Sequence, residues 1–166
     1  NIKNIRVLAG SNILNPLRYP IASNELEAKF CPAFMVSAIA LRRKAGVHEF
    51  NDDFVRSEPV QALMQKVECI LDPEIEAQGW EKIRSTVEVD MDDGQTLVQV
   101  ANEHYRGGPD APFSRDDLLE KFNDCAQLVL SDSEASELFS SVESLESMAN
   151  VQELVQKLVP QPEVGK

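Results

Sequence analysis

Several features that define common protein classes are absent from this sequence. It contains no apolar run of the roughly 18 residues that a membrane-spanning helix needs, and it does not start with a signal-peptide pattern. Basic residues are outnumbered, because 16 Lys and Arg stand against 28 Asp and Glu, which gives a formal net charge of -12. Binding to nucleic-acid phosphates requires clustered Lys and Arg. We therefore expect no membrane insertion and no nucleic-acid partner.

Cysteine and histidine are also scarce. The three cysteines, Cys31, Cys69 and Cys125, form no CxxC pair. They indicate a reducing compartment, and we expect a cytoplasmic protein. The two histidines, His48 and His104, lie in no metal-binding spacing, and neither a GxSxG motif nor a P-loop is present. These patterns predict no metal site, no cofactor and no catalytic residue in the chain.

What the sequence does contain is typical of a globular protein. Its 166 residues are 43% hydrophobic and 27% charged, enough for one domain with a real core or a domain with an appendage. The most apolar stretch is residues 25–46, where Pro32 suits the first position of a helix. Positive charge at residues 42–44 suits the last turn, and Gly46 suits the position after the helix. We expect a largely buried core helix.

The start of this helix is the candidate binding site. A helix N-terminus beside a lysine favours an anionic ligand, which makes Lys29 the first candidate for ligand contact. The alternative is an ordinary solvated lysine. Cys31 lies close to the same helix start, where a thiol can have a lowered pKa, but it can equally be a small buried thiol.

The clearest local signal is a β-hairpin. Asp93 and Gly94 are typical of a two-residue type I′ turn. Such a turn places Val89 opposite Val98, so that apolar side chains meet on one face of the sheet. Residues 2–9 and the short apolar run 67–71 are predicted to be strands of the same sheet.

The last third of the chain is predicted to be helical. Three capping pairs mark helix starts: Ser114 with Asp117, Ser131 with Glu134, and Asn150 with Glu153. The helices carry apolar stripes made of Leu118, Phe122, Phe139, Val142, Leu154, Val155 and Leu158. A soluble monomer rarely exposes such surface, so the helices should fold back on the sheet or pair with a second copy. We expect the second arrangement, a homodimer.

The fold class that follows is α+β. We expect an antiparallel sheet of three to four strands with helices on one face in residues 1–113, helices in residues 114–159, and a flexible tail in residues 160–166. From residues and spacing alone, the sequence supports no function narrower than that of a soluble α+β domain.

Several short segments also occur in an order and spacing that match a known family. They are residues 27–31 (EAKFC), 50–52 (FND), 59–67 (PVQALMQKV), 93–94 (DG) and 108–114 (GPDAPFS), with 121–122 (KF) following. Together they resemble the C-terminal half of the MmgE/PrpD family over roughly residues 1–145. That family includes 2-methylcitrate dehydratase, cis-aconitate decarboxylase and an iminodisuccinate epimerase.

The resemblance implies a lid of chorismate-mutase-like fold, followed by helices that return to a large helical domain. It also implies a lyase, either a dehydratase or a decarboxylase, or alternatively an epimerase, that acts on a small polycarboxylic acid. The family's main acid–base residues lie in the helical domain, so we expect this chain alone to be inactive. The substrate-binding residues carried over from the family's E-A-K-F-S segment are Lys29, Cys31 and Phe34, with Cys31 in place of the family serine. Some relatives have an aromatic hydroxyl where this chain has Phe34.

A function of a different class is also consistent with this pattern. The chain would then be a non-catalytic α+β binding or oligomerisation module that shares the fold. A helical region of roughly 250 residues encoded upstream, the size of ordinary enzyme domains, would favour the lyase.

Overall fold

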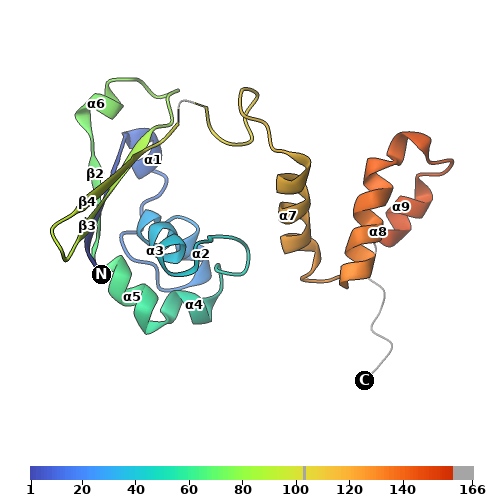
Figure 1. The fold of residues 1–166 in the computed structure, drawn as a ribbon, viewed down its shortest axis with the longest axis horizontal. Coiled ribbons are helices and arrows are strands. Elements are labelled where there is room, and N and C mark those ends of the chain that lie inside the picture. The colour runs from blue at the N-terminus through green and yellow to red at the C-terminus, as the bar shows by residue number, and fades with distance from the viewer. Residues whose placement is uncertain (103, 159–166) are drawn as a thin grey trace. The chain divides into compact units, whose positions relative to one another are not determined.

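A computed structural model describes residues 1–102 and 104–158 of the chain (Figure 1). The chain forms two compact units, Asn1–Ala111 and Pro112–Lys166, which we call unit 1 and unit 2. The tail predicted for residues 160–166 lies outside the described residues. Each unit is described by itself below.

Unit 1 is built on a sheet of four strands in the order β2-β1-β3-β4. The strands are β1 (Ile2–Ala9), β2 (Val67–Leu71), β3 (Ser85–Met91) and β4 (Thr96–Val100). The predicted strands 2–9 and 67–71 are therefore confirmed, and so is the α+β class. The expectation of a purely antiparallel sheet was wrong, because β1 and β2 are parallel while the other pairs are antiparallel. The reason is the long helical connection between β1 and β2, since parallel neighbours require a crossover.

The helices of unit 1 are short apart from one. They are α1 (Ser11–Leu14), α2 (Glu25–Ala28), α3 (Pro32–Arg42), α4 (Asp52–Arg56), α5 (Glu58–Met64) and α6 (Pro73–Glu76). The central helix α3 begins at Pro32 as predicted. It ends earlier than predicted, because Arg43 itself takes the left-handed conformation (φ 60°) that was expected of Gly46.

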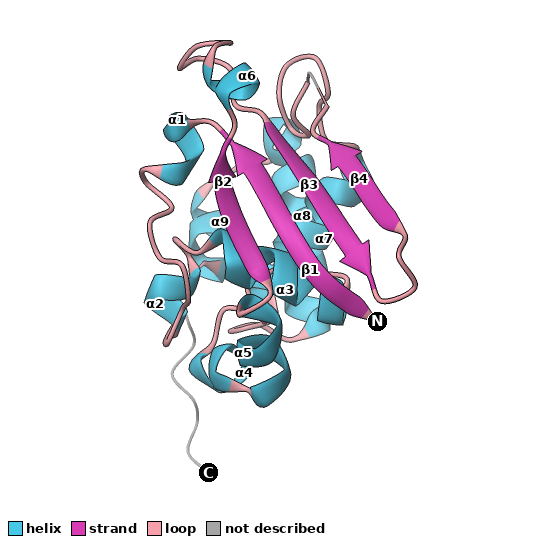
Figure 2. Ribbon diagram, turned by 90° about the vertical axis from the view of Figure 1, so that its left-hand side faces the viewer, coloured by secondary structure: helices cyan, strands magenta, loops and turns pink. Residues whose placement is uncertain are grey.

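The core of unit 1 lies between α3, α5 and one face of the sheet. Ile5 and Val7 of β1 pack there against Leu63 of α5, with Val87 and Val89 of β3 alongside. Figure 2 looks onto the opposite face, where the strands lie in front of α3 and α5. Helices thus cover one face of the sheet, as the alternating pattern of the strands predicted.

The β3–β4 hairpin has a different register from the one predicted. Val89 lies opposite Leu97 instead of Val98. The loop is one residue longer, because the Gly94 amide donates to the Met91 carbonyl at 3.0 Å and Gly94 has a φ of +89°. This is a tight turn followed by a left-handed glycine, a common alternative to the two-residue turn. Since side chains alternate along a strand, the shift turns Val98 to the face of the sheet that α3 and α5 leave uncovered.

Unit 2 consists of helices. They are α7 (Arg115–Ala126), α8 (Asp132–Glu143), the 3-10 turn η1 (Leu145–Ser147) and α9 (Gln152–Lys157). The capping boxes of Ser114 with Asp117 and Ser131 with Glu134 are confirmed. The third predicted helix is present, but its capping pair does not form: the Asn150 side chain accepts from the amide of Gln152, the first residue of α9, at 2.9 Å, and the N-cap residue Val151 makes no side-chain cap bond.

Two contacts hold α7 and α8 of unit 2 together. Arg115 at the start of α7 makes a bidentate pair with Glu143 at the end of α8, at 2.6 and 2.7 Å. Further along, the rings of Phe122 and Phe139 lie 5.4 Å apart. The helices are therefore antiparallel neighbours, with the apolar residues of both helices partly facing each other.

Candidate functional site

The predicted site lies at the turn between α2 and α3. The side chain of Asn24 caps α2 by accepting from the Glu27 amide at 3.0 Å. Lys29 follows as the C-cap of that helix, and Cys31 is the N-cap of α3. Residues 29–31 thus connect the two helices, with Lys29 and Phe30 exposed and Cys31 buried.

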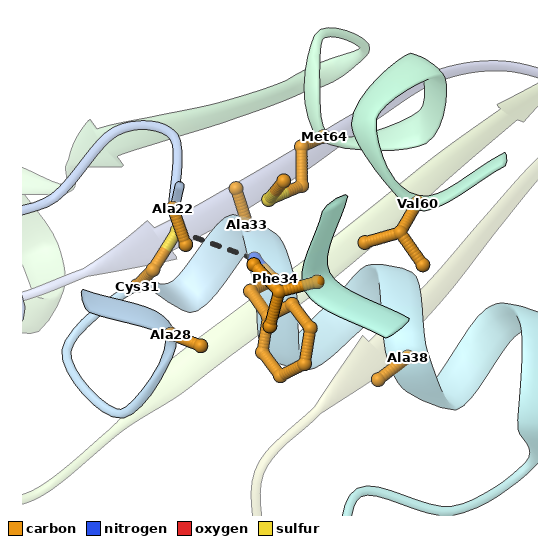
Figure 3. Packing of buried hydrophobic residues seen from close by; sticks show 9 residues of the cluster. Ala22, Ala28, Cys31, Ala33, Phe34, Ala38, Val60 and Met64 are labelled. Carbon is orange, nitrogen blue, oxygen red and sulfur yellow. Dashed lines mark hydrogen bonds between the residues drawn. The ribbon is translucent and has the colours of Figure 1, made fainter. Parts of the chain in front are cut away.

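Cys31 is fully buried, and its sulfur occupies the start of α3 (Figure 3). Its Sγ accepts from the Phe34 amide at 3.3 Å. Backbone amides of Ala33 and Ala22 also donate to this sulfur, yet burial raises the pKa of the Cys31 thiol above its usual range. Of the two interpretations of this cysteine, the structure supports the buried thiol. The first amides of α3 therefore already have an acceptor within the chain.

Phe34 belongs to the aromatic part of the core. Its side chain is fully buried, and its ring meets Phe50 edge-on at 5.1 Å and Phe54 at 6.1 Å. Such edge-to-face pairs stabilise a core beyond the effect of apolar burial. Of the three residues expected to bind substrate, Cys31 and Phe34 thus point inward, and Lys29 lies exposed at the surface.

A second exposed basic residue, Arg18, belongs to a stretch that is hydrogen-bonded to the stretch of Lys29. The Tyr19 amide donates to the Phe30 carbonyl at 3.1 Å, which joins the stretch containing Arg18 to the stretch containing Lys29. Arg18 is exposed, and its guanidinium lies 5.6 Å from the ring of Tyr19. Sequence reasoning missed Arg18, because residues 10–24 showed only loop chemistry and the contact between the two stretches arises in the tertiary fold.

Two carboxylates of the same region, those of Glu27 and Asp52, are engaged elsewhere. Glu27 accepts from the amide and hydroxyl of Ser23 at 2.8 and 2.7 Å, and these bonds lower the pKa of its carboxyl group. Asp52 pairs with Arg56 at 2.9 Å. Over residues 1–102 and 104–158, no carboxylate lies within ion-pair distance of the Lys29 ammonium or the Arg18 guanidinium. These two cations are therefore available for an anionic ligand.

A comparison with profiles of protein families matches the MmgE/PrpD C-terminal domain to residues 1–147. The chain belongs to the MmgE/PrpD family. The match includes all of unit 1 together with α7, α8 and η1 of unit 2, and it stops before α9. No curated protein sequence matches the chain.

In this MmgE/PrpD domain, unit 2 exposes much of its apolar surface. No residue of α7 is buried. Leu118, Val142, Val155 and Leu158, all members of the predicted apolar stripes, are 50% to 61% exposed. The helices also enclose a mainly apolar pocket of about 270 Å³, whose lining includes Phe122. Contacts among the three helices of unit 2 therefore leave these apolar side chains exposed.

The structure also bears on membrane insertion and on metal binding. No helix in the described part of the chain combines the length and apolar character needed to cross a bilayer. Among the same residues, no group of His, Cys, Asp and Glu side chains has an arrangement that could hold a metal ion.

Proposed function

We propose that this chain is the C-terminal domain of a lyase of the MmgE/PrpD family and that it helps to bind a small polycarboxylic acid. The observation that carries this proposal concerns Arg18 and Lys29, two exposed cations on stretches that a backbone hydrogen bond joins. Neither has a carboxylate within ion-pair distance among the described residues, although the chain is strongly acidic. A lysine or an arginine in this state can offer charge-assisted hydrogen bonds to a carboxylate. Family membership supports the same substrate class.

The proposed reaction begins with removal of a proton α to a carboxylate. Water or carbon dioxide then leaves, or the carbon is re-protonated in an epimerase. Such a reaction requires a positioned base and stabilisation of the developing negative charge. Lys29 and Arg18 would hold a carboxylate of the substrate and so contribute to orientation and charge stabilisation. The base would come from the helical domain, where the main acid–base residues of the family are expected to lie.

Substitution of Lys29 tests the binding role. The assay protein is this chain joined to a helical domain of the family, with 2-methylcitrate, cis-aconitate and iminodisuccinate as substrates. Because a hydrogen bond to a charged group contributes about 1.5–3 kcal/mol, Lys29→Met should raise KM by roughly ten- to a hundredfold. Lys82→Met, at another exposed lysine of unit 1, is the control and should change little. An unchanged KM in Lys29→Met would contradict the proposed role.

The chain without a helical domain is proposed to be inactive. Its contribution is to hold a carboxylate, and binding without a base gives no proton transfer. Purified chain should therefore show no turnover of 2-methylcitrate, cis-aconitate or iminodisuccinate. Turnover that persists after repeated purification would show that the chain carries its own base.

Unit 2 is proposed to dock onto the family's helical domain. The apolar surface of Leu118, Val142, Val155 and Leu158 supports this, because burying one such side chain contributes about 1.5–3 kcal/mol. The second candidate function, a non-catalytic oligomerisation module, uses the same surface to pair two copies. Val142→Glu separates the two: it should weaken binding of an added helical domain in the first case and self-association in the second.

A cytoplasmic location is part of the same proposal. All three cysteines are unpaired thiols in the structure, and Cys31 is buried as a neutral thiol. Free thiols are typical of reducing compartments.

A further inference from the structure

A polar groove lies at one end of the sheet in unit 1. Figure 2 shows α6 above the end of the sheet where β3 begins and β4 ends. The groove has a volume of about 350 Å³ and is lined by residues of α6, by the residues that lead into β3 and by the end of β4. All of its lining residues belong to unit 1.

Asp72 fixes the part of the groove that α6 forms. Its amide donates to the Ala9 carbonyl at 3.0 Å, at the end of β1. Its carboxylate accepts from the amides of Glu74 and Ile75 at 2.8 and 2.9 Å, which caps α6. These bonds hold the start of α6 beside the sheet. Ile75 is buried, and the side chain of Glu74 is exposed.

Arg84 contributes the positive charge of the groove. It precedes β3, is half-buried, and donates from its guanidinium to the carbonyl of Asn102, just after β4, at 3.0 Å. Thr86 and Val100 pair across β3 and β4. Both face the uncovered side of the sheet, because the next residue of β3, Val87, packs in the core. They add a hydroxyl group and an apolar side chain to the lining.

The charged groups of the groove do not neutralise one another. Over residues 1–102 and 104–158, no carboxylate lies within ion-pair distance of the Arg84 guanidinium. The Glu74 carboxylate has no basic partner in the same part of the chain. Arg84 and Glu74 are therefore opposite charges on the lining of one groove, and they lie beyond ion-pair distance of each other.

This arrangement favours a ligand that carries both charges. A simple anion would be attracted to Arg84 but repelled by Glu74 and Asp72, and a simple cation would be repelled by Arg84. A molecule with one carboxylate and one ammonium group can instead make a charge-assisted hydrogen bond to Arg84 and another to Glu74. Ile75 and Val100 offer apolar surface to a hydrocarbon side chain.

The volume of the groove limits the size of such a ligand. At about 30 Å³ for each water-sized atom, the groove has room for roughly a dozen non-hydrogen atoms. We propose that it binds a free α-amino acid with an apolar side chain such as leucine, with the carboxylate on Arg84, the ammonium group on Glu74 and the side chain against Ile75 and Val100. Arg18 and Lys29 do not line this groove, so binding here does not depend on the proposed function.

The first test compares ligands on the unmodified chain, so it does not depend on how any variant folds. Calorimetric titration of the 166-residue chain with L-leucine should give saturable binding. Isocaproate lacks the ammonium group of leucine, and isopentylamine lacks its carboxylate. Each loses one charge-assisted bond and should bind at least tenfold more weakly than leucine. Absence of leucine binding, or equal affinity for leucine and either analogue, would overturn the proposal.

Two variants assign the two charges of the ligand to residues. Glu74→Gln should weaken leucine binding at least tenfold without weakening isocaproate binding, because isocaproate has no ammonium group. Arg84→Met should weaken leucine binding to a similar degree without weakening isopentylamine binding. Glu81→Gln is the control, since it removes an exposed carboxylate between α6 and β3 that does not line the groove. Equal loss of leucine affinity in Glu81→Gln and Glu74→Gln would indicate general electrostatic attraction and overturn the assignment.

Amide NMR spectra of the unmodified chain locate the ligand independently. On addition of leucine, the largest shift changes should fall at residues 72–78, 84–86 and 100–101. Changes centred on the stretches of Arg18 and Lys29 would place leucine at the cations of the proposed function and would overturn the proposal for this groove.

Discussion

Substitution of Phe34 tests whether its ring is packed in the core of unit 1 or lines a pocket for a ligand. Its side chain is fully buried, with Phe50 and Phe54 at ring distances of 5.1 and 6.1 Å. Truncating a buried phenylalanine to alanine costs about 3–5 kcal/mol, since apolar burial is lost and a cavity remains. Phe34→Ala should therefore remove a large part of the stability of unit 1. Phe30→Ala, at an aromatic residue 43% exposed and four positions earlier, is the control and should cost far less.

The more informative variant is Phe34→Tyr. It adds one hydroxyl group and keeps the ring, so it restores the aromatic hydroxyl that some relatives are expected to have. If the ring is surrounded by core, the hydroxyl must be buried without a partner, at a cost of about 1–3 kcal/mol. If the ring edge instead reaches a ligand pocket, the hydroxyl is solvated and the variant is close to neutral. The changes in unfolding free energy that the two interpretations predict for Phe34→Tyr therefore differ by more than the measurement error.

Amide hydrogen exchange is the suitable assay, because it reports on unit 1 separately from unit 2. The amides of β1 (Ile2–Ala9), in the middle of the sheet, should open only when unit 1 unfolds. A loss of about 3–5 kcal/mol in Phe34→Ala accelerates their exchange by at least roughly a hundredfold, and Phe34→Tyr should give roughly five- to a hundredfold. Exchange in Phe34→Tyr equal to that of the unmodified chain would refute the assignment of Phe34 to the core.

Three further variants test individual parts of unit 1. Ser37→Ala should stabilise unit 1 by about 1 kcal/mol in urea unfolding, because the buried Ser37 hydroxyl has no hydrogen-bond partner among the residues that the structure describes. A loss of stability would mean that this hydroxyl is bonded. Gly94→Ala should destabilise the hairpin by about 1–2 kcal/mol, because Gly94 has a left-handed φ. The stability of Gly94→Asn should lie between those of the unmodified chain and the alanine variant. An alanine variant as stable as the unmodified chain would argue against the three-residue loop. Hydrogen bonds from Arg6 and Thr96 lower the pKa of Asp90 in the folded state. The ionised Asp90 therefore stabilises the folded state above about pH 4, the ordinary aspartate value, and this stabilisation is lost as the pH falls through the lower pKa of the folded state. Asp90→Asn should therefore unfold with a smaller dependence on pH in this acidic range, and an unchanged acid titration curve would contradict the network.

Much of the local structure could be predicted from the sequence, because it depends on residues close together in the chain. Pro32 begins α3 where its missing amide has no helical acceptor to lose. Ser131 and Glu134 cap α8 through bonds that span three residues, and the strands at residues 2–9 and 67–71 follow from their apolar character. The order of several short segments also sufficed to identify the MmgE/PrpD family, which the family profile confirms.

The burial of the candidate site residues could be predicted only in part, for a related reason. Lys29 is exposed at the surface, as a ligand-binding lysine requires. The inward orientation of Cys31 and Phe34, and the approach of Arg18 through the Tyr19–Phe30 hydrogen bond, depend on how the loop after β1 packs against α2 and α3. A sequence pattern gives the periodicity of an element but does not identify the segment that covers each of its sides.

The hairpin register and the parallel pairing of β2 with β1 were likewise decided by tertiary structure. Asp93 and Gly94 are compatible with turns of two or three residues, and the local pattern of valines favoured the shorter one. The longer loop places Leu97 opposite Val89 and leaves Val98 on the uncovered face. Turn types differ by little in local energy, whereas strand pairing and the packing of a whole face on α3 and α5 involve many residues at once. The sequence therefore determines where the elements lie, and the contacts among distant elements determine which of the compatible registers is adopted.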